Sequence, residues 1–311
     1  MLLTAADACE EAGVPCVSST FPWQVYYYGR GARESTPFRW TYHFCWGLDD
    51  IAEVFADLWE QAERFRAARG VPVERRSAGD VVAARGAGFR PGRPRTRAPA
   101  GGPGSYTEPA ADLSGHVRAF AEADADIVTS AATARDLALF RALAAGHGGT
   151  PRLITCSRWL AYPPSTTGGG GRPAQADVAT LVYWTPAHPY RSSLDGMTAA
   201  ELAGAYEQAT GRQWLQPLGL AYALFEVAAH ALRTAADPTD PAAVAAAVGR
   251  TRLETVAGPL DWTAGPVPNV ATVRLAGGQW QQGARHDYEL AVVSNRHVEG
   301  LPVDADLVPL R

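Results

Sequence analysis

The sequence predicts an α/β fold with mainly parallel sheets, and three observations support this prediction. Short apolar runs rich in β-branched residues alternate with segments of helical periodicity over most of the chain, which is typical of parallel strands joined by helices. Hydrophobic residues make up 47% of the 311 residues, enough for the core of one large or two ordinary domains. The longest break in the alternation, 84–104, is almost entirely Ala, Arg, Gly and Pro and is typical of a flexible linker.

The clearest helix is expected over 49–69, where apolar residues recur at helical spacing and Asp49 is placed to cap the first turn. Thr198 is followed three residues later by Glu201, which is a capping box. An Asp-Pro pair at 240–241 opens the last helix. Helices are therefore predicted at 49–69, 111–124, 133–146, 198–210, 214–235 and 239–249, after a first helix that contains Cys9.

Buried strands are expected where short apolar runs lie between these helices. The segment 271–282 is interpreted as a hairpin that turns at Gly277-Gly278, because Gly-Gly pairs favour tight turns. The parallel strands are predicted at 14–18, 125–130, 151–156 and 179–184.

Composition excludes several classes of function. All 28 basic residues are arginine, so no chemistry that needs a lysine is available, whether a P-loop, a Schiff base or an S-x-x-K site. A formal net charge of -4 argues against a broad nucleic-acid or anionic-membrane surface. Phe89 is the one aromatic residue among the arginines of 84–104, so the stretch lacks the interleaved aromatic platforms of a nucleic-acid arm, which disfavours that interpretation. No apolar run is long enough for a membrane span, and no secretory signal is visible at the N-terminus.

No motif points to catalysis, a metal or a cofactor. The seven histidines never fall at the i, i+4 spacing of a helical metal pair, and no G-x-S-x-G elbow is present. The glycine-rich stretches at 86–92 and 165–171 lack the flanking strand, helix or lysine of a phosphate cradle. We therefore expect no enzyme, no metal and no cofactor. The four cysteines follow no zinc spacing; Cys9 and Cys16 could close a disulfide, and the alternative is free buried thiols.

Several long strings resemble one known family. The strings at 183–232, 251–262 and 268–280 look like the closing part of a type I periplasmic binding protein, the branched-chain-amino-acid-type substrate-binding subunit of ABC transporters. DACEEAGVPCVSSTFPW at 7–23 is similar to a helix, strand and ligand-loop unit of that family, and 105–130 is similar to its lobe II strand and helix. The strings occur in the family's order from about residue 5 to 300, apart from 70–104.

This resemblance implies two doubly wound lobes that are joined by three crossovers and close on a ligand in the cleft between them by hinge motion. Lobe I is expected at 1–47 and 190–268, and lobe II at 48–189 and 269–311, the latter with C-terminal strands and a tail. The family's first strands and its signal sequence have no counterpart, so lobe I is expected to be incomplete and the chain N-terminally truncated. For 70–104 we hypothesise a compensated frameshift, since GC-rich DNA read out of frame yields mostly Ala, Arg, Gly and Pro codons.

The expected ligand residues follow strands at their carboxyl ends, where backbone donors converge in parallel sheets. Ser18, Ser19 and Thr20 leave the strand at 14–18 and carry hydroxyls that suit a carboxylate or amide oxygen. The alternative for these hydroxyls is an ordinary cap. Trp23 lies on the same loop and is expected to form a wall of the cleft or to pack in the core.

Phe44 and Trp46, at the first crossover, are further candidates, with core packing as the alternative. Ser157 and Arg158 follow the strand at 151–156, where amino-acid binders of the family offer an acid to the ligand ammonium. Arg158 at this place favours an anionic or amide ligand. His188, between prolines at the second crossover, is interpreted as a hinge residue.

The resemblance thus implies a monomeric, extracytoplasmic solute-binding subunit of an ABC importer. Its partners would be a small polar ligand (an amino acid, amide or organic anion) and the ABC permease subunits, with no nucleic acid and no metal. Two alternatives stay open: a small-molecule enzyme on a doubly wound α/β fold, and a non-functional remnant of a binding protein.

Overall fold

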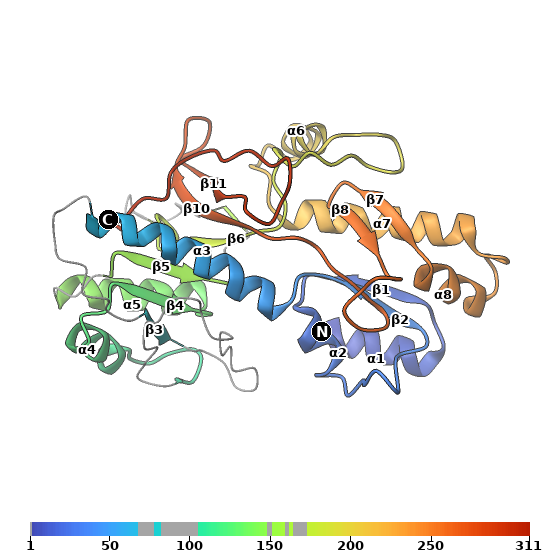
Figure 1. Ribbon diagram of the computed structural model, residues 1–311, viewed down its shortest axis with the longest axis horizontal. Helices are drawn as coiled ribbons and strands as arrows, with labels where there is room; N and C mark the ends of the chain where they lie inside the picture. Colours follow the sequence, from blue (N-terminus) through green and yellow to red (C-terminus); the bar gives the residue numbers. More distant parts are fainter. Residues whose placement is uncertain (1, 68–77, 82–104, 148–150, 159–161, 164–172) are drawn as a thin grey trace. The chain divides into compact units, whose positions relative to one another are not determined.

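The computed structural model describes residues 2–67, 78–81, 105–147, 151–158, 162–163 and 173–311. The chain forms two compact units, each built from separate stretches of sequence (Figure 1). Unit 1 comprises Met1–Asp50 and Tyr183–Leu275, and unit 2 comprises Ile51–Val182 and Ala276–Arg311. Most of the atypical stretch 70–104, including the frameshift hypothesis attached to it, lies outside the described residues, as does the glycine-rich stretch 165–171.

Unit 1 is a parallel sheet covered by helices on both faces. The strand order is β1-β2-β9, with Ser18 opposite His43 in the register between β1 and β2. A short antiparallel hairpin, β7-β8, stands beside this sheet. The elements are α1 (Leu2–Ala12), β1 (Cys16–Ser19), α2 (Trp23–Tyr27), β2 (Thr41–Phe44), α6 (Ala199–Thr210), α7 (Pro217–Thr234), α8 (Pro241–Gly249), β7 (Arg252–Thr255), β8 (Gly258–Asp261) and β9 (Val270–Ala271).

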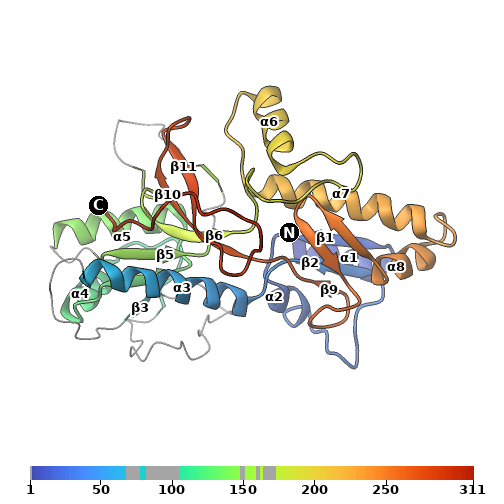
Figure 2. The ribbon, with the colours of Figure 1, turned by 45° about the horizontal axis from the view of Figure 1, so that its top comes forward.

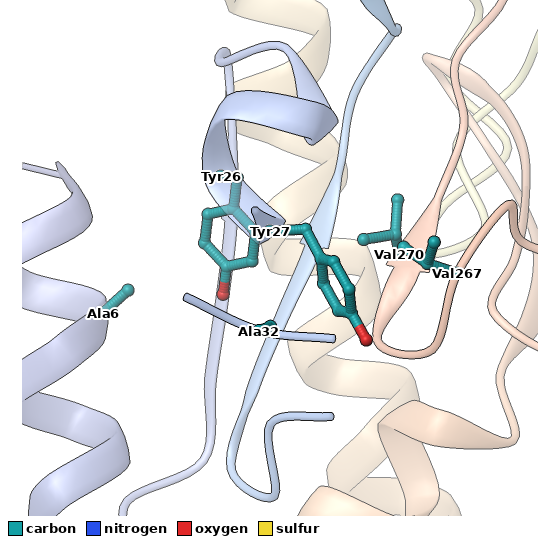
Figure 3. Close-up of a cluster of buried hydrophobic side chains, with 6 residues drawn as sticks. All are labelled: Ala6, Tyr26, Tyr27, Ala32, Val267 and Val270. Atoms are coloured by element: carbon teal, nitrogen blue, oxygen red, sulfur yellow. The ribbon is translucent and has the colours of Figure 1, made fainter. Parts of the chain in front are cut away.

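Alternation along β2 assigns the helices of unit 1 to the two faces, since successive side chains of a strand point to opposite sides. The His43 ring stacks on Tyr26 of α2, with ring centroids 4.2 Å apart. Tyr42, the preceding residue, points the other way, toward Gly249 at the end of α8. Helix α2 shares its face with α1: Figure 3 shows Tyr26 and Tyr27 beside α1, with the loop before β9 on their other side.

Unit 2 is a six-stranded mixed sheet in the order β11-β10-β6-β5-β4-β3, in which β3 to β6 are parallel and β10 and β11 are antiparallel (Figure 2). Helix α3 begins in unit 1 and covers one face, where the Trp59 indole N–H donates to the Thr155 hydroxyl at 3.3 Å. Ile154 points to the opposite face, against α5. The elements are α3 (Leu48–Ala67), β3 (Ala78–Val81), α4 (Ser114–Glu122), β4 (Ile127–Ser130), α5 (Ala134–Gly146), β5 (Leu153–Cys156), β6 (Ala179–Val182), β10 (Ala276–Gln282) and β11 (Tyr288–Ser294).

The predicted hairpin at Gly277-Gly278 is wrong. Both glycines lie inside β10, which pairs with β6 on one side and with β11 on the other. They are required by close packing rather than by a turn. A Cβ atom on Gly277 would meet Leu58 of α3 at 2.8 Å, and one on Gly278 would meet Val182 at 2.3 Å.

The helices and strands that periodicity predicts are otherwise confirmed within a few residues, and two local expectations need correction or completion. Asp49 is exposed, and it is the Asp50 carboxylate that accepts the Gly47 backbone N–H at 2.6 Å at the start of α3. The capping box at Thr198 and Glu201 is present with both of its hydrogen bonds. All four cysteines are free thiols, so of the two alternatives the structure shows the reduced one.

In the part of the chain that the structure describes, no helix is long and apolar enough to cross a membrane.

Candidate functional site

In unit 1 the candidate residues gather where β1 and β2 end. Ser18 and Ser19 are both buried, and each turns its hydroxyl inward to the neighbouring strand. The Ser19 hydroxyl donates to the Phe44 carbonyl at 2.7 Å. The Ser18 hydroxyl lies 2.9 Å from Nδ1 of His43. Both hydroxyls therefore stabilise the pairing of β1 with β2. The two serines then have only their backbone groups to offer at the loop after β1.

Thr20 differs from the two serines. It is exposed and adopts a left-handed backbone conformation with φ of 70°, which is uncommon for a β-branched residue. Its hydroxyl donates to the Ser19 carbonyl at 2.6 Å. The strained turn at Thr20 redirects the chain at the carboxyl end of β1, a position at which backbone strain often accompanies binding loops.

Trp23 is positioned by the segment that follows β2. Its backbone N–H donates to the Trp46 carbonyl at 3.1 Å. The indole packs so closely over Gly47 that a Cβ atom there would lie 2.5 Å from Nε1 of Trp23. The nearby Gln24 side chain accepts the Leu48 N–H at 2.8 Å. Gly47 is thus required for this packing, and the Trp23 side chain is half-buried against the segment that follows β2.

The two aromatic candidates of the first crossover occupy different settings. Phe44 is fully buried and packs edge-on against Trp262, with ring centroids 6.0 Å apart, so it is a core residue of unit 1. Trp46 stacks on Tyr183 with ring centroids 4.4 Å apart and an interplanar angle of 26°. This stacked pair joins the first and second crossover segments within unit 1.

His43 was missed by sequence reasoning, because a histidine inside a short strand carries no local signal. Its Nε2 lies 2.7 Å from the Phe21 carbonyl and must donate to it, which leaves Nδ1 to accept from Ser18. Burial lowers the pKa of His43 to about 4. The ring is therefore neutral near pH 7 and ties the loop after β1 to β2.

In unit 2 the candidates Ser157 and Arg158 directly follow β5. The Ser157 N–H donates to the Ser130 carbonyl at the end of β4 at 3.2 Å. Nη1 of Arg158 lies 2.8 Å from both carboxylate oxygens of Glu108. Glu108 offsets the charge that sequence reasoning assigned to Arg158 alone, and it comes from a segment fifty residues earlier, so no local pattern could have predicted the pair.

Unit 2 also contains three buried polar groups, on Tyr106, His116 and Asp136. The Tyr106 hydroxyl, Nε2 of His116 and Oδ2 of Asp136 are buried, and none has a hydrogen-bond partner among the described residues. The Tyr106 and His116 rings meet edge to face at 5.7 Å. Burial raises the pKa of Tyr106, and the Asp136 carboxylate raises it further. Buried polar atoms of this kind are normally satisfied by an ordered water or a bound group.

His188 in the second crossover is held by one nitrogen. Its Nδ1 accepts the Thr185 backbone N–H at 2.9 Å, so the neutral ring carries its proton on Nε2, which is buried without a partner among the described residues. Burial lowers the pKa of His188 to about 4. The Tyr190 ring lies beside it at 5.7 Å. These contacts are those of a neutral structural histidine in the crossover.

The arrangement supplies hydrogen bonds, aromatic surface and one ion pair. In the described residues, no group of three or more His, Cys, Asp or Glu side chains is placed to hold a metal ion. A cavity of about 120 Å³ lies beside α5 in unit 2, and its lining includes Phe140, Ile154 and Leu310 but none of the candidate residues. Chemically, each unit by itself presents polar groups at the carboxyl end of its parallel strands.

Comparison with known proteins relates the chain to one family. The family model described as "Periplasmic binding protein" matches residues 2–284. No curated protein matches the chain.

Solved structures share the fold at low sequence identity. A periplasmic binding protein type 1 from Bordetella pertussis Tohama I is 15% identical, with a TM-score of 0.63 over 94% of this chain and 78% of its own. A leucine-binding protein, LivK, from Thermotoga maritima MSB8 is 15% identical, with a TM-score of 0.61 over 94% of this chain and 77% of its own. An ABC transporter solute-binding protein from R. palustris, in complex with benzoate, is 12% identical, with a TM-score of 0.61 over 99% of this chain and 76% of its own.

Proposed function

The chain belongs to the periplasmic binding protein family, and from this premise we propose that it is the extracytoplasmic solute-binding subunit of an ABC importer. Its ligand would be a small polar molecule: an amino acid, an amide or an organic anion. The permease subunits of the importer would be its protein partners. In this role the chain binds and delivers a ligand without changing it.

One observation carries the proposal. In both units, candidate residues lie at the carboxyl ends of parallel strands: Ser19 ends β1 and Thr20 follows it, and Ser157 and Arg158 follow β5. Backbone donors converge at such ends, and small ligands of open α/β sheets bind there. In unit 1, Trp23 adds a half-buried aromatic surface to this end of the sheet.

The ion pair between Arg158 and Glu108 bears on the ligand class. The Arg158 side chain is 47% exposed and the Glu108 side chain 21%, so the guanidinium is the more accessible partner. A planar guanidinium suits a carboxylate through paired N–H donors. This geometry favours a ligand with a carboxylate, and LivK and the benzoate complex are named for ligands of that kind.

The proposal is tested by thermal denaturation of the purified chain with millimolar leucine, benzoate or benzamide. A ligand at 100 times its Kd stabilises the folded state by about 2.7 kcal/mol, so a binder shows a clear rise in Tm, and mass spectrometry finds the ligand unchanged afterwards. Consumption of the ligand would instead support an enzyme. Absence of any shift with all three ligands counts against the proposed ligand class.

The variant Arg158→Gln separates the role of the guanidinium from general stability. If Arg158 holds the carboxylate, the variant weakens benzoate binding about 10-fold or more, because a charge-assisted hydrogen bond contributes about 1.5–3 kcal/mol. Benzamide, which has no charge to match, should lose less. Arg252→Gln is the matched control, since Arg252 is 72% exposed and pairs with Asp261 on the β7-β8 hairpin. Equal losses of benzoate affinity in both variants would show that Arg158 does not contact the ligand.

A further inference from the structure

Two of the four thiols are neighbours at the open edge of the unit 1 sheet. Cys9 lies in the last turns of α1, and Cys16 is the first residue of β1. The turn between them is closed by a hydrogen bond from the Val14 N–H to the Cys9 carbonyl at 2.9 Å. Cys9 lies three residues after the buried Ala6 and shares its side of α1, and Cys16 shares the strand face of Ser18, whose hydroxyl meets His43. Helix α1 packs directly on β1, so both cysteine side chains lie between the helix and this face of the strand.

Accessibility distinguishes this pair from the other two cysteines. Cys45 and Cys156 are fully buried, whereas Cys9 and Cys16 are partly exposed. Burial raises the pKa of the Cys16 thiol as it does those of Cys45 and Cys156, so it is exposure that separates the pair from the other two. Because the thiolate is the reactive form and must be reached by a reagent, any thiol reaction of the folded chain is directed to Cys9 and Cys16.

A buried cation stands beside the pair. The Arg30 side chain is 1% exposed, and its Nε donates to Asp7 of α1 at 2.6 Å while its Nη1 donates to the Thr41 hydroxyl at 3.1 Å. Its Nη2 is buried and has no hydrogen-bond partner among the described residues. Burial and the neighbouring Cys9 raise the pKa of the Cys16 thiol to about 11, and the Arg30 charge opposes this rise. Arg30 therefore favours the Cys16 thiolate, while burial and Cys9 disfavour it more strongly.

We propose that Cys9 and Cys16 form a dithiol–disulfide site, oxidised by a small disulfide compound of the glutathione type. A thiolate of the pair attacks one sulfur of the oxidant and releases one glutathione thiolate. The second cysteine then attacks the mixed disulfide and releases the other. The two protons of the protein thiols pass to the two released thiolates, so one dithiol and one disulfide oxidant become one protein disulfide and two thiols. The product links α1 covalently to the edge strand β1, two residues before Ser18.

The chain makes the test direct, because it has no lysine and its first arginine is Arg30. Trypsin therefore releases Cys9 and Cys16 together in the fragment 1–30, while Cys45 and Cys156 fall in other fragments. The folded protein is incubated with oxidised glutathione at pH 8.5, alkylated and digested. Fragment 1–30 should lose two hydrogens and take up no alkylating reagent. A second cleavage after Glu10 or Glu11 should leave the two halves joined until a reductant is added.

Single variants and a stability measurement complete the experiment. Cys9→Ser or Cys16→Ser should stop at the mixed disulfide with glutathione, and Cys45→Ser should react like the unchanged chain. Closing a short loop in the unfolded state should raise Tm by about 5 °C in the oxidised form. A fragment 1–30 that remains fully alkylated, or that carries only glutathione adducts in the unchanged chain, would overturn the proposal. Ligand binding in the reduced form tests the proposed function separately, so failure of one leaves the other standing.

Discussion

The buried carboxylate of Glu226 gives the sharpest prediction about stability. Glu226 lies in α7 and is 0% exposed. One of its oxygens accepts the Ser193 backbone N–H at 2.5 Å and the Ser193 hydroxyl at 2.9 Å, and the other accepts the Val256 N–H at 3.0 Å. The Glu226 side chain therefore connects both the second crossover segment and the turn between β7 and β8 to α7 by hydrogen bonds.

Glu226→Ala removes all three hydrogen bonds. Water can replace the carboxylate at Ser193, which is exposed, but not at Val256, which is 0% exposed. An unsatisfied buried donor costs about 1–3 kcal/mol, and each lost bond to a charged group about 1.5–3 kcal/mol. Because water recovers part of the loss at Ser193, we expect the free energy of unfolding to fall by about 3–5 kcal/mol. Glu226→Gln keeps one acceptor oxygen and should cost about half as much.

The assay is urea denaturation followed by tryptophan fluorescence. It reports on this region because the Trp184 indole N–H donates to the Val256 carbonyl at 3.0 Å. Glu201→Ala is the control: it removes an exposed capping box and should cost about 1 kcal/mol. The reasoning is refuted if Glu226→Ala is no more destabilising than Glu201→Ala.

Three further predictions concern pH and packing. Burial lowers the pKa values of His43 and His188 to about 4. Between pH 6.5 and 4 the unfolded chain therefore binds more protons than the folded chain, and the free energy of unfolding decreases as the pH is lowered. Each histidine should contribute about 3 kcal/mol to that decrease. Urea midpoints at pH 7.5 and 5 test the sign, and a flat profile would contradict it. His188→Asn should flatten the profile without abolishing it, because His43 still titrates. Gly278→Ala places a Cβ 2.3 Å from Val182 and should cost about 1–3 kcal/mol, whereas Gly204→Ala on the open face of α6 should gain about 1 kcal/mol; equal effects at the two glycines would refute the packing argument.

Local patterns predicted the regular elements of both units well. The stripe that begins near residue 49 became α3, and the capping box at Thr198 opens α6 as expected. Strand β2 was not predicted as an element distinct from the crossover that follows it. It has only four residues, which is too short for a periodic pattern, and its neighbours are aromatic. The Gly277-Gly278 pair misled for a related reason: Gly-Gly is typical of a turn, and only the neighbours Leu58 and Val182 show that it is needed inside a strand.

The candidate site was predicted less completely than the fold. The loops after β1 and β5 were predicted from the positions of the strands together with the family resemblance. The roles in ligand binding of the residues named there stay predictions: Ser18, Ser19, Thr20, Trp23, Ser157 and Arg158. The inward hydrogen bonds of Ser18 and Ser19 could not be predicted, since their acceptors lie on β2. The buried groups of Tyr106, His116 and Asp136 were missed because these residues come from separate parts of the chain and share no local pattern.

By itself, the sequence determined which chemistries lack their reactive group and where helices and strands alternate. These properties depend on residue type and on spacing over a few turns, which a linear pattern records. Only the tertiary structure decided which charges and hydroxyls are already used. Arg158 meets Glu108 across fifty residues, and Glu226 joins segments thirty residues to either side of it. Such pairings depend on which elements the fold brings together, so the same residue types could have been free ligands in another fold.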